Sequence, residues 1–131
     1  MITRILGATA LLFAGPILGA AWADSIDDDQ LDPKQIYFGD PKAFDSPAGV
    51  IMEKIIQATP EYKEIRKKKV KPGTSKYLIL LSKATDRAMG AITKVAEEQQ
   101  YDLIAAKSYL KGLDPKVAAE DATKLAVEKF K

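Results

Sequence analysis

The sequence predicts an α+β fold in which a small β body, formed by both ends of the chain, carries a projecting antiparallel helical hairpin. A short apolar segment of β type lies near the start, a long stretch with heptad spacing occupies the middle, and a second β-type segment follows it. With 131 residues, of which 47% are hydrophobic and 29% charged, the chain has the size of one domain.

Residues 1–23 have the pattern of a cleavable signal peptide. Arg4 supplies a positive start, residues 5–18 form an uncharged apolar run, and Ala21-Trp22-Ala23 places small residues where signal peptidase reads the chain. An uncleaved membrane anchor is the alternative, but a run of about 14 residues is shorter than the roughly 20 that span a bilayer. We therefore expect cleavage after Ala23 and export to the periplasm.

The exported chain is expected to begin with an acidic, flexible lead-in over residues 24–33, because this segment is rich in aspartate and poor in large apolar groups. The domain proper is expected over residues 34–131. Its first element is a short strand at Gln35-Ile36-Tyr37-Phe38, bounded by Pro33 and by the turn signal Gly39-Asp40-Pro41.

The helical hairpin is expected over about residues 47–100. Ser46-Pro47 has the form of a helix N-cap followed by proline at the first helical position, which predicts an outgoing helix that ends near Ala58. Thr59-Pro60 repeats this signal, so Pro60 either begins a second helix or kinks the first one. Pro72-Gly73 then stops the outgoing segment and reverses the chain.

A long return helix is predicted from about Thr74 to Gln100. Apolar residues recur along it at alternating spacings of four and three, at Tyr77, Leu81, Ala84, Ala88, Ala91 and Val95. This is the heptad seam of a helix packed lengthwise on another, and its alanines permit close approach. At about 1.5 Å per residue, the arm should be on the order of 40 Å long.

The chain returns to β-type patterns after the hairpin. Residues 101–105 are expected to form a strand, and residues 108–110 a second extended piece before Gly112. Asp121 or a neighbour can cap a terminal helix whose core residues have helical spacing, at Ala122, Leu125, Ala126 and Phe130.

In this order the segments resemble the OmpH/Skp family of periplasmic chaperones, over most of residues 34–130. The resemblance is carried by the signal peptide, the strand of residues 36–40, Ser46-Pro47-Ala48-Gly49 at the start of the outgoing helix, the sequence from Ala96-Glu97-Glu98 to Asp102-Leu103-Ile104, and the last helix at residues 121–127. It implies a homotrimer in which strands of three subunits form the body and helical arms enclose a cavity for unfolded outer-membrane proteins. The short hairpin makes this chain a short-armed variant.

Candidate site residues lie on the hairpin. Basic residues near the arm tips occur in that family, and here Arg66, Lys67, Lys68, Lys69 and Lys71 precede the predicted tip. A holdase also needs exposed apolar surface that contacts an unfolded client weakly and at many points, so that release requires no ATP. The arm residues that could supply this surface are Val50, Ile51, Ile55, Tyr62, Leu78 and Ile79.

The composition argues against an enzyme. The chain has no cysteine and no histidine, which excludes thiolate chemistry, disulfides and the most frequent general base and zinc ligand. Glycine-rich nucleotide loops do not occur, and Asp27-Asp28-Asp29 lacks the EF-hand ligand spacing. We expect no catalytic residue, no cofactor and no metal, and the net charge of +2 gives no general case for nucleic acid.

Two other classes of function stay open. The hairpin of an envelope adaptor or structural protein would bind one folded partner. A membrane-surface protein would instead use the lysines of residues 67–71 to contact anionic head groups. A basic cluster beside a turn is also consistent with a plain solvated helix face.

Overall fold

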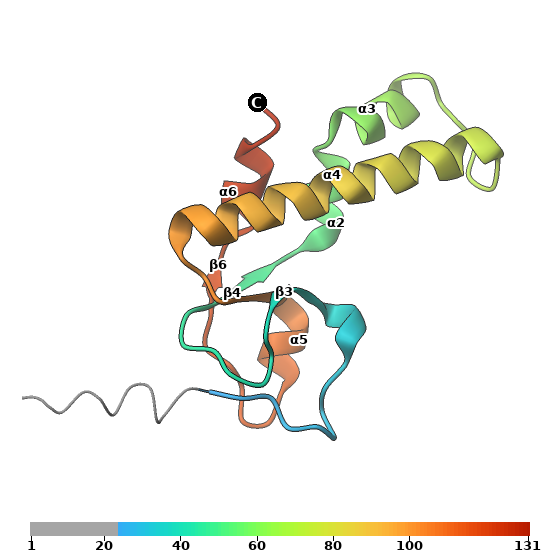
Figure 1. The fold of residues 1–131 in the computed structure, drawn as a ribbon. Coiled ribbons are helices and arrows are strands. Elements are labelled where there is room, and N and C mark those ends of the chain that lie inside the picture. The colour runs from blue at the N-terminus through green and yellow to red at the C-terminus, as the bar shows by residue number, and fades with distance from the viewer. Residues whose placement is uncertain (1–23) are drawn as a thin grey trace, which may run out of the picture.

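A four-stranded open sheet lies at the centre of the molecule, with the strand order β3-β5-β4-β6 (Figure 1). Its strands are β3 (Ile36–Gly39), β4 (Pro47–Val50), β5 (Leu103–Ala106) and β6 (Glu120–Asp121). β5 pairs antiparallel with β3 and parallel with β4, and β4 pairs parallel with β6. The computed structural model describes residues 24–131, so the predicted signal peptide lies outside the described residues. The predicted α+β class is confirmed.

Helices cover both faces of this sheet (Figure 1). α4 crosses one face together with α2 and α6, while α5 and the N-terminal segment cover the other. The helical elements are the 3-10 turn η1 (Pro33–Gln35), α2 (Met52–Gln57), α3 (Pro60–Lys67), α4 (Ser75–Gln99), α5 (Lys107–Gly112) and α6 (Thr123–Glu128).

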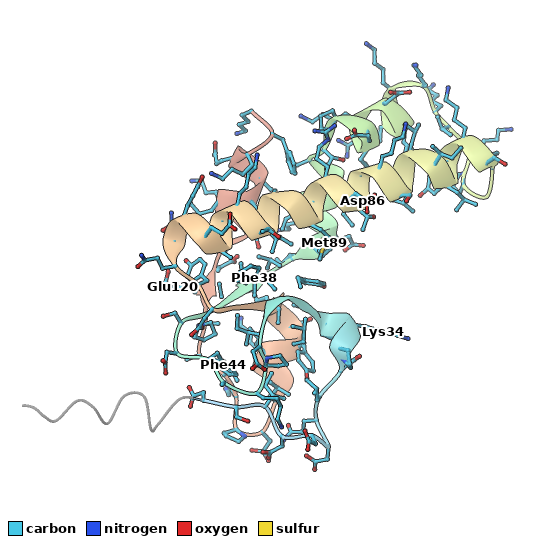
Figure 2. The ribbon with its side chains drawn as sticks, in the orientation of Figure 1. Lys34, Phe38, Phe44, Asp86, Met89 and Glu120 are labelled. Carbon is cyan, nitrogen blue, oxygen red and sulfur yellow. The ribbon has the colours of Figure 1, made fainter. Side chains whose placement is uncertain are left out.

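Two hydrophobic cores follow from the alternation of side chains along the strands. Val50 and Ile104 belong to the first core, between the sheet and α2, α4 and α6. Leu103 belongs to the second core, beneath α5 and the N-terminal segment. Figure 2 shows Phe38 on the α4 side of the sheet and Phe44 inside the second core.

The start of the hairpin differs from the prediction. Residues 47–50 are strand β4, and the first helix begins only at Met52. Ala48, Gly49 and Val50 are buried, since β4 lies between β5 and β6 and pairs with both. A strand that is buried on both faces is apolar throughout and lacks the alternation of apolar and polar residues. A short run of this kind cannot be told from a buried helix turn by its sequence pattern. The Ser46-Pro47 pattern therefore gave the wrong element.

The segment after β5 was also predicted wrongly. Residues 108–110, expected to be extended, form the middle of α5. This helix directs Leu110, 1% exposed, into the second core, where Leu113 follows it. Farther along the chain the N-cap of α6 is Ala122, which makes no side-chain cap hydrogen bond, so the expected cap by Asp121 differs from the structure. The Asp121 carboxylate, one residue earlier, accepts a hydrogen bond from the Thr123 N–H at 3.0 Å.

The acidic N-terminal segment is packed against the body, whereas the sequence predicted a flexible lead-in. Asp24 forms a two-way backbone bridge with Phe44, with N···O distances of 2.8 and 2.9 Å. Ile26 is only 3% exposed and belongs to the second core. The Lys42 ammonium donates to the Ile26 carbonyl at 2.8 Å and to the Asp28 carboxylate at 2.7 Å. One buried isoleucine and these hydrogen bonds hold a segment whose composition alone indicates disorder.

The long helix has the predicted length and seam. α4 spans Ser75–Gln99, and the seam alanines at 84, 88 and 91 are buried together with Val95. In its first turns Leu80 is buried in place of the predicted Leu81, which is half-buried. Only the C-terminal half of α4 packs in the first core, from Ala88 onward, so the part that projects from the sheet is about half of the predicted 40 Å.

Candidate functional site at the arm tip

The projecting part of the molecule, here called the arm, consists of α3, the turn at residues 68–74 and the N-terminal half of α4 (Figure 1). Glu61 on α3 and Arg87 on α4 join the two helices through two hydrogen bonds of 2.7 Å each. The Arg87 guanidinium beside Glu61 lowers the pKa of that carboxyl, chiefly through these hydrogen bonds. The arm therefore has a fixed base close to the body.

Pro60 begins a new helix, which settles the alternative left open by the sequence. Thr59 is its N-cap and is fully buried. The Thr59 hydroxyl donates to the Ile56 carbonyl at 2.6 Å and accepts from the Tyr62 N–H at 3.1 Å. Both hydrogen-bonding roles of the buried hydroxyl are thus satisfied, and the chain bends between α2 and α3 at a fixed position.

The turn at the end of the arm is also closed by hydrogen bonds. Lys69 has a left-handed backbone with φ 51°, and the next N–H, of Val70, donates to the Ile65 carbonyl at 3.0 Å. This is the Schellman pattern that ends a helix. Gly73, with φ 88°, and the Thr74 N-cap then start α4, where the Thr74 hydroxyl accepts from the Tyr77 N–H at 3.2 Å.

Charge is concentrated on the segment 63–83, here called the cationic tip. The segment holds eight basic residues and one acidic residue, Glu64, which gives it a net charge of +7. Besides the hydrogen bonds from Arg87, the positive charge of Lys83, at the end of this segment, lowers the pKa of Glu61. Within residues 24–131, Lys68 is the one member that forms an ion pair, a contact of 3.3 Å with Glu64. The basic residues of the tip are Lys63, Arg66, Lys67, Lys68, Lys69, Lys71, Lys76 and Lys83.

Two large apolar side chains are exposed within this charged segment. Leu78 is 58% exposed and Ile79 is 56% exposed, on the outer half of α4. Lys76 and Lys83 lie one turn before and one turn after Ile79, so their side chains flank it on the same side of the helix. Among the described residues the remaining exposed large hydrophobic side chain is Leu125, 38% exposed on α6.

The apolar residues predicted to bind a client do not form one surface. Leu78 and Ile79 lie at the cationic tip, and Tyr62 is half-buried on α3, with the Arg66 guanidinium 5.4 Å from its ring centre. Ile51 is half-buried beside the sheet, where its N–H donates to the Thr123 hydroxyl at 2.9 Å.

Two of the predicted surface residues are core residues instead. Val50 is 1% exposed in β4, and Ile55 is fully buried in α2. Both belong to the first core, so the expectation that they line an open apolar face is corrected. The reason is that residues 47–58 are part of the body and not of the projecting arm.

The basic cluster is larger than the sequence reasoning indicated. The predicted basic tip residues, Arg66 to Lys69 and Lys71, are all exposed or lie in the exposed turn. The structure adds Lys76 and Lys83 from the N-terminal half of α4, which the chain reversal packs against α3. Their seven-residue spacing around Ile79 is a signal present in the sequence.

Among residues 24–131, no cluster of three or more acidic side chains has the arrangement needed to hold a metal ion. In the same part of the chain, no helix has the length and apolar character required to cross a bilayer. Comparisons with protein-family models, with curated proteins and with solved structures found no match to this chain.

Proposed function

We propose that this protein is an ATP-independent holdase of the OmpH/Skp type, which binds unfolded envelope proteins in the periplasm and is not an enzyme. The observation that carries the proposal is the exposure of Leu78 and Ile79 in the middle of a segment with net charge +7. An exposed apolar pair attracts unfolded chains, while the surrounding lysines keep the protein soluble.

The construction of the arm supports this role. Its two helices are joined at Glu61 and Arg87, and its turn is closed at Lys69 and Thr74, so the apolar pair is presented on a fixed support. A single pair of side chains gives weak binding. We propose that the chain forms a homotrimer, in which three arms act on one client and multiply the weak contacts.

The test is suppression of aggregation. Residues 24–131 are mixed at a stoichiometric ratio with a urea-denatured outer-membrane β-barrel protein, and light scattering is followed after dilution. We expect the wild type to suppress scattering and the variant Leu78→Ser/Ile79→Ser to lose that effect. Leu125→Ser is the matched control, since it removes an exposed leucine from α6, away from the arm.

Three outcomes decide the proposal. Suppression by the wild type and by Leu125→Ser, but not by the tip variant, supports it. Failure of the wild type to suppress aggregation contradicts it. Equal suppression by the tip variant would place client binding elsewhere. The mass of residues 24–131 in solution, measured over a range of concentrations, tests the trimer separately.

The cationic tip also favours a second candidate, a non-catalytic adaptor that uses the arm to bind an anionic membrane surface or an acidic folded partner. Seven of the eight basic side chains form no ion pair within residues 24–131, which leaves most of the charge of the cationic tip available for such a contact. This candidate predicts binding to anionic but not zwitterionic vesicles, lost at high salt. Aggregation suppression through Leu78 and Ile79 would persist at the same salt concentration.

A further inference from the structure

A cavity of about 690 Å³ opens on the face of the body that carries α5, away from the arm. Gly49 of β4 contributes to it from the sheet side, and Leu110 and Val117 supply apolar side chains. Leu110 is 1% exposed, so the floor of the cavity is continuous with the second core. The volume lies in the range of sites that hold small organic molecules.

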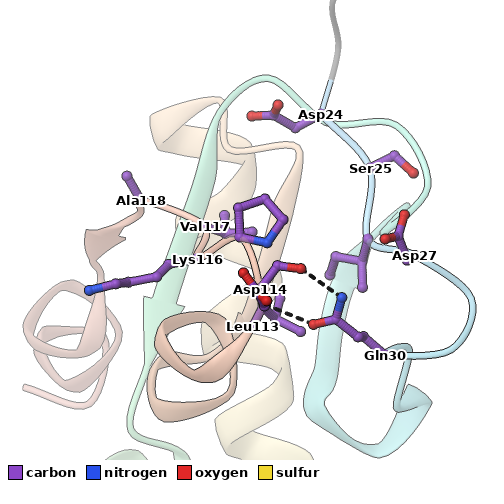
Figure 3. A pocket seen from close by; sticks show the side chains of 11 residues that line it. Asp24, Ser25, Asp27, Gln30, Leu113, Asp114, Lys116, Val117 and Ala118 are labelled. Atoms are coloured by element: carbon purple, nitrogen blue, oxygen red, sulfur yellow. Dashed lines mark hydrogen bonds between the residues drawn. The ribbon is translucent and has the colours of Figure 1, made fainter.

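The walls of this cavity are held in place. A Cβ added at Gly49 would lie 3.0 Å from the Lys107 Cα, so β4 and the start of α5 are in direct contact. The loop at residues 113–119 is tied to α5 by the Val117 N–H, which donates to the Leu110 carbonyl at 3.1 Å. Farther along, the Gln30 side-chain amide makes two 2.8 Å hydrogen bonds with the Asp114 backbone (Figure 3). These contacts fix the position of the residues around the cavity.

The charged residues that line the cavity are all lysines, at 107, 111 and 116, and none of its lining residues is acidic. Lys107 is paired with Asp121 at 2.9 Å, whereas Lys111 and Lys116 form no ion pair within residues 24–131. Figure 3 shows the Lys116 side chain directed away from Asp27 and Gln30, on the opposite side of the loop. Two lysines without an ion-pair partner among the described residues thus line the cavity together with its apolar residues.

We propose that this cavity binds a small organic carboxylate that carries an apolar group. The carboxylate would accept hydrogen bonds from the Lys111 and Lys116 ammonium groups, and the apolar group would cover Val117, Ala118 and Ala119. This lining selects for the combination, because a bare anion leaves the apolar side chains uncovered and a neutral apolar molecule leaves both charges unpaired. A free fatty acid and the C-terminal residue of a polypeptide share this chemistry.

The experiment is a titration of the full-length chain, labelled with ¹⁵N, followed by two-dimensional NMR. The ligands are octanoate, octylammonium, acetate, and a short peptide that ends in phenylalanine with either a free carboxylate or an amide. We expect saturable shifts of the amides of residues 110–118 with octanoate or the free-acid peptide. Octylammonium, acetate and the peptide amide should bind much more weakly.

The matched variants remove charge and keep side-chain length. Lys111→Met/Lys116→Met should weaken carboxylate binding by about tenfold, as expected when charged hydrogen-bond donors are lost. Lys34→Met/Lys94→Met, at two exposed lysines outside the cavity, should bind as the wild type does. Binding of octanoate alone assigns the ligand to free acids, and binding of the peptide alone assigns it to chain termini.

Three results would overturn the proposal. They are the absence of binding by any of the carboxylates, equal shifts of the same amides by octylammonium, and unchanged affinity in Lys111→Met/Lys116→Met. The cavity and the arm lie on different parts of the molecule, so these results are independent of whether the protein is a holdase.

Discussion

Arg87 lies beside Glu61, 26 positions away in the chain, and its guanidinium donates two hydrogen bonds of 2.7 Å to the Glu61 carboxylate. This paired geometry is the strongest polar contact between α3 and α4. Arg87 lies next to Ala88, where α4 enters the first core. The contact therefore marks the boundary between the body and the projecting arm.

Removing this pair should loosen the arm without unfolding the body. In Glu61→Gln, we expect faster amide hydrogen exchange in α3 and little change in the melting temperature, because the pair lies at the surface. Lys68→Met is the matched control, since it removes an exposed pair within α3 that does not reach α4. Unchanged exchange in α3 of Glu61→Gln would contradict the role given to this contact.

The same pair predicts a pH dependence of the arm. The pKa of Glu61 is lowered from its ordinary value of 4.5 in the folded protein. Its contribution to arm stability is therefore complete above pH 4.5 and is lost as the pH falls through the lowered folded-state pKa. Protection factors of the α3 amides, which correct for the intrinsic pH dependence of exchange, should fall over that acidic range in the wild type. In Glu61→Gln the fall over the same range should be absent.

Substitutions at Ile55 and Ile79 should have different effects on the free energy of unfolding, because one residue lies in the first core and the other is exposed on the arm. Ile55→Ala leaves a cavity beside α4 and should lower the free energy of unfolding by about 2–5 kcal/mol. Ile79→Ala, at a side chain that is 56% exposed, should leave the free energy of unfolding nearly unchanged. Urea denaturation measures both. A stable Ile55→Ala variant would be inconsistent with the burial of this residue in the first core.

Replacing Gly49 or Gly90 by alanine should change the free energy of unfolding in opposite directions. Gly49→Ala brings a Cβ to 3.0 Å from the Lys107 backbone and should lower the free energy of unfolding by about 1–3 kcal/mol. Gly90, in the middle of α4, has open space around the position of an added Cβ. Gly90→Ala should raise the free energy of unfolding by about 0.5–1 kcal/mol. Thermal denaturation of the two variants gives a direct comparison.

Asp121 should stabilise the protein in a pH-dependent manner. Its pKa is lowered from 3.8 to about 2 by hydrogen bonds from Lys107 and from Thr123. Its contribution is present above pH 3.8 and is lost as the pH falls through about 2. Because the side chain is 44% exposed, we expect Asp121→Asn to cost only about 1 kcal/mol at pH 7.

The control for this prediction is Asp29→Asn, at an exposed carboxylate of the N-terminal segment. Urea denaturation at pH 7 should show a loss for Asp121→Asn but not for Asp29→Asn. Near pH 2 the difference between Asp121→Asn and the wild type should shrink. A difference that is equally large at both pH values would show that the charge of Asp121 is not its cause.

Local signals predicted the elements whose ends are capped by their own side chains. Thr59-Pro60 and Thr74 mark the starts of α3 and α4 in the structure, and the alanine seam of α4 is buried as expected. Strands β3 and β5 also appear where their β-branched and apolar residues indicated. In each of these cases the information lies within a few residues of the element itself.

The elements that were missed depend on distant partners. β4 is a strand because β5 and β6 occupy both of its edges, and no residue near Pro47 encodes those neighbours. The N-terminal segment is ordered because Ile26 enters a core completed by Leu103 and Leu110. For the site, the sequence indicated the basic cluster and the pair at 78 and 79, but not the burial of Val50 and Ile55.

The arm is inserted between two adjacent strands. β4 and β5 lie next to each other in parallel, with a register that runs from Pro47 opposite Leu103 to Val50 opposite Ala106. The connection between them contains the whole arm, together with α2 and the C-terminal half of α4. Doubling the length of a flexible connection costs only about 0.6 kcal/mol in closure entropy. Insertions or deletions of whole helical turns near Gly73 are therefore compatible with an unchanged sheet. The arm can therefore vary in length while the sheet and the two cores that support it stay the same.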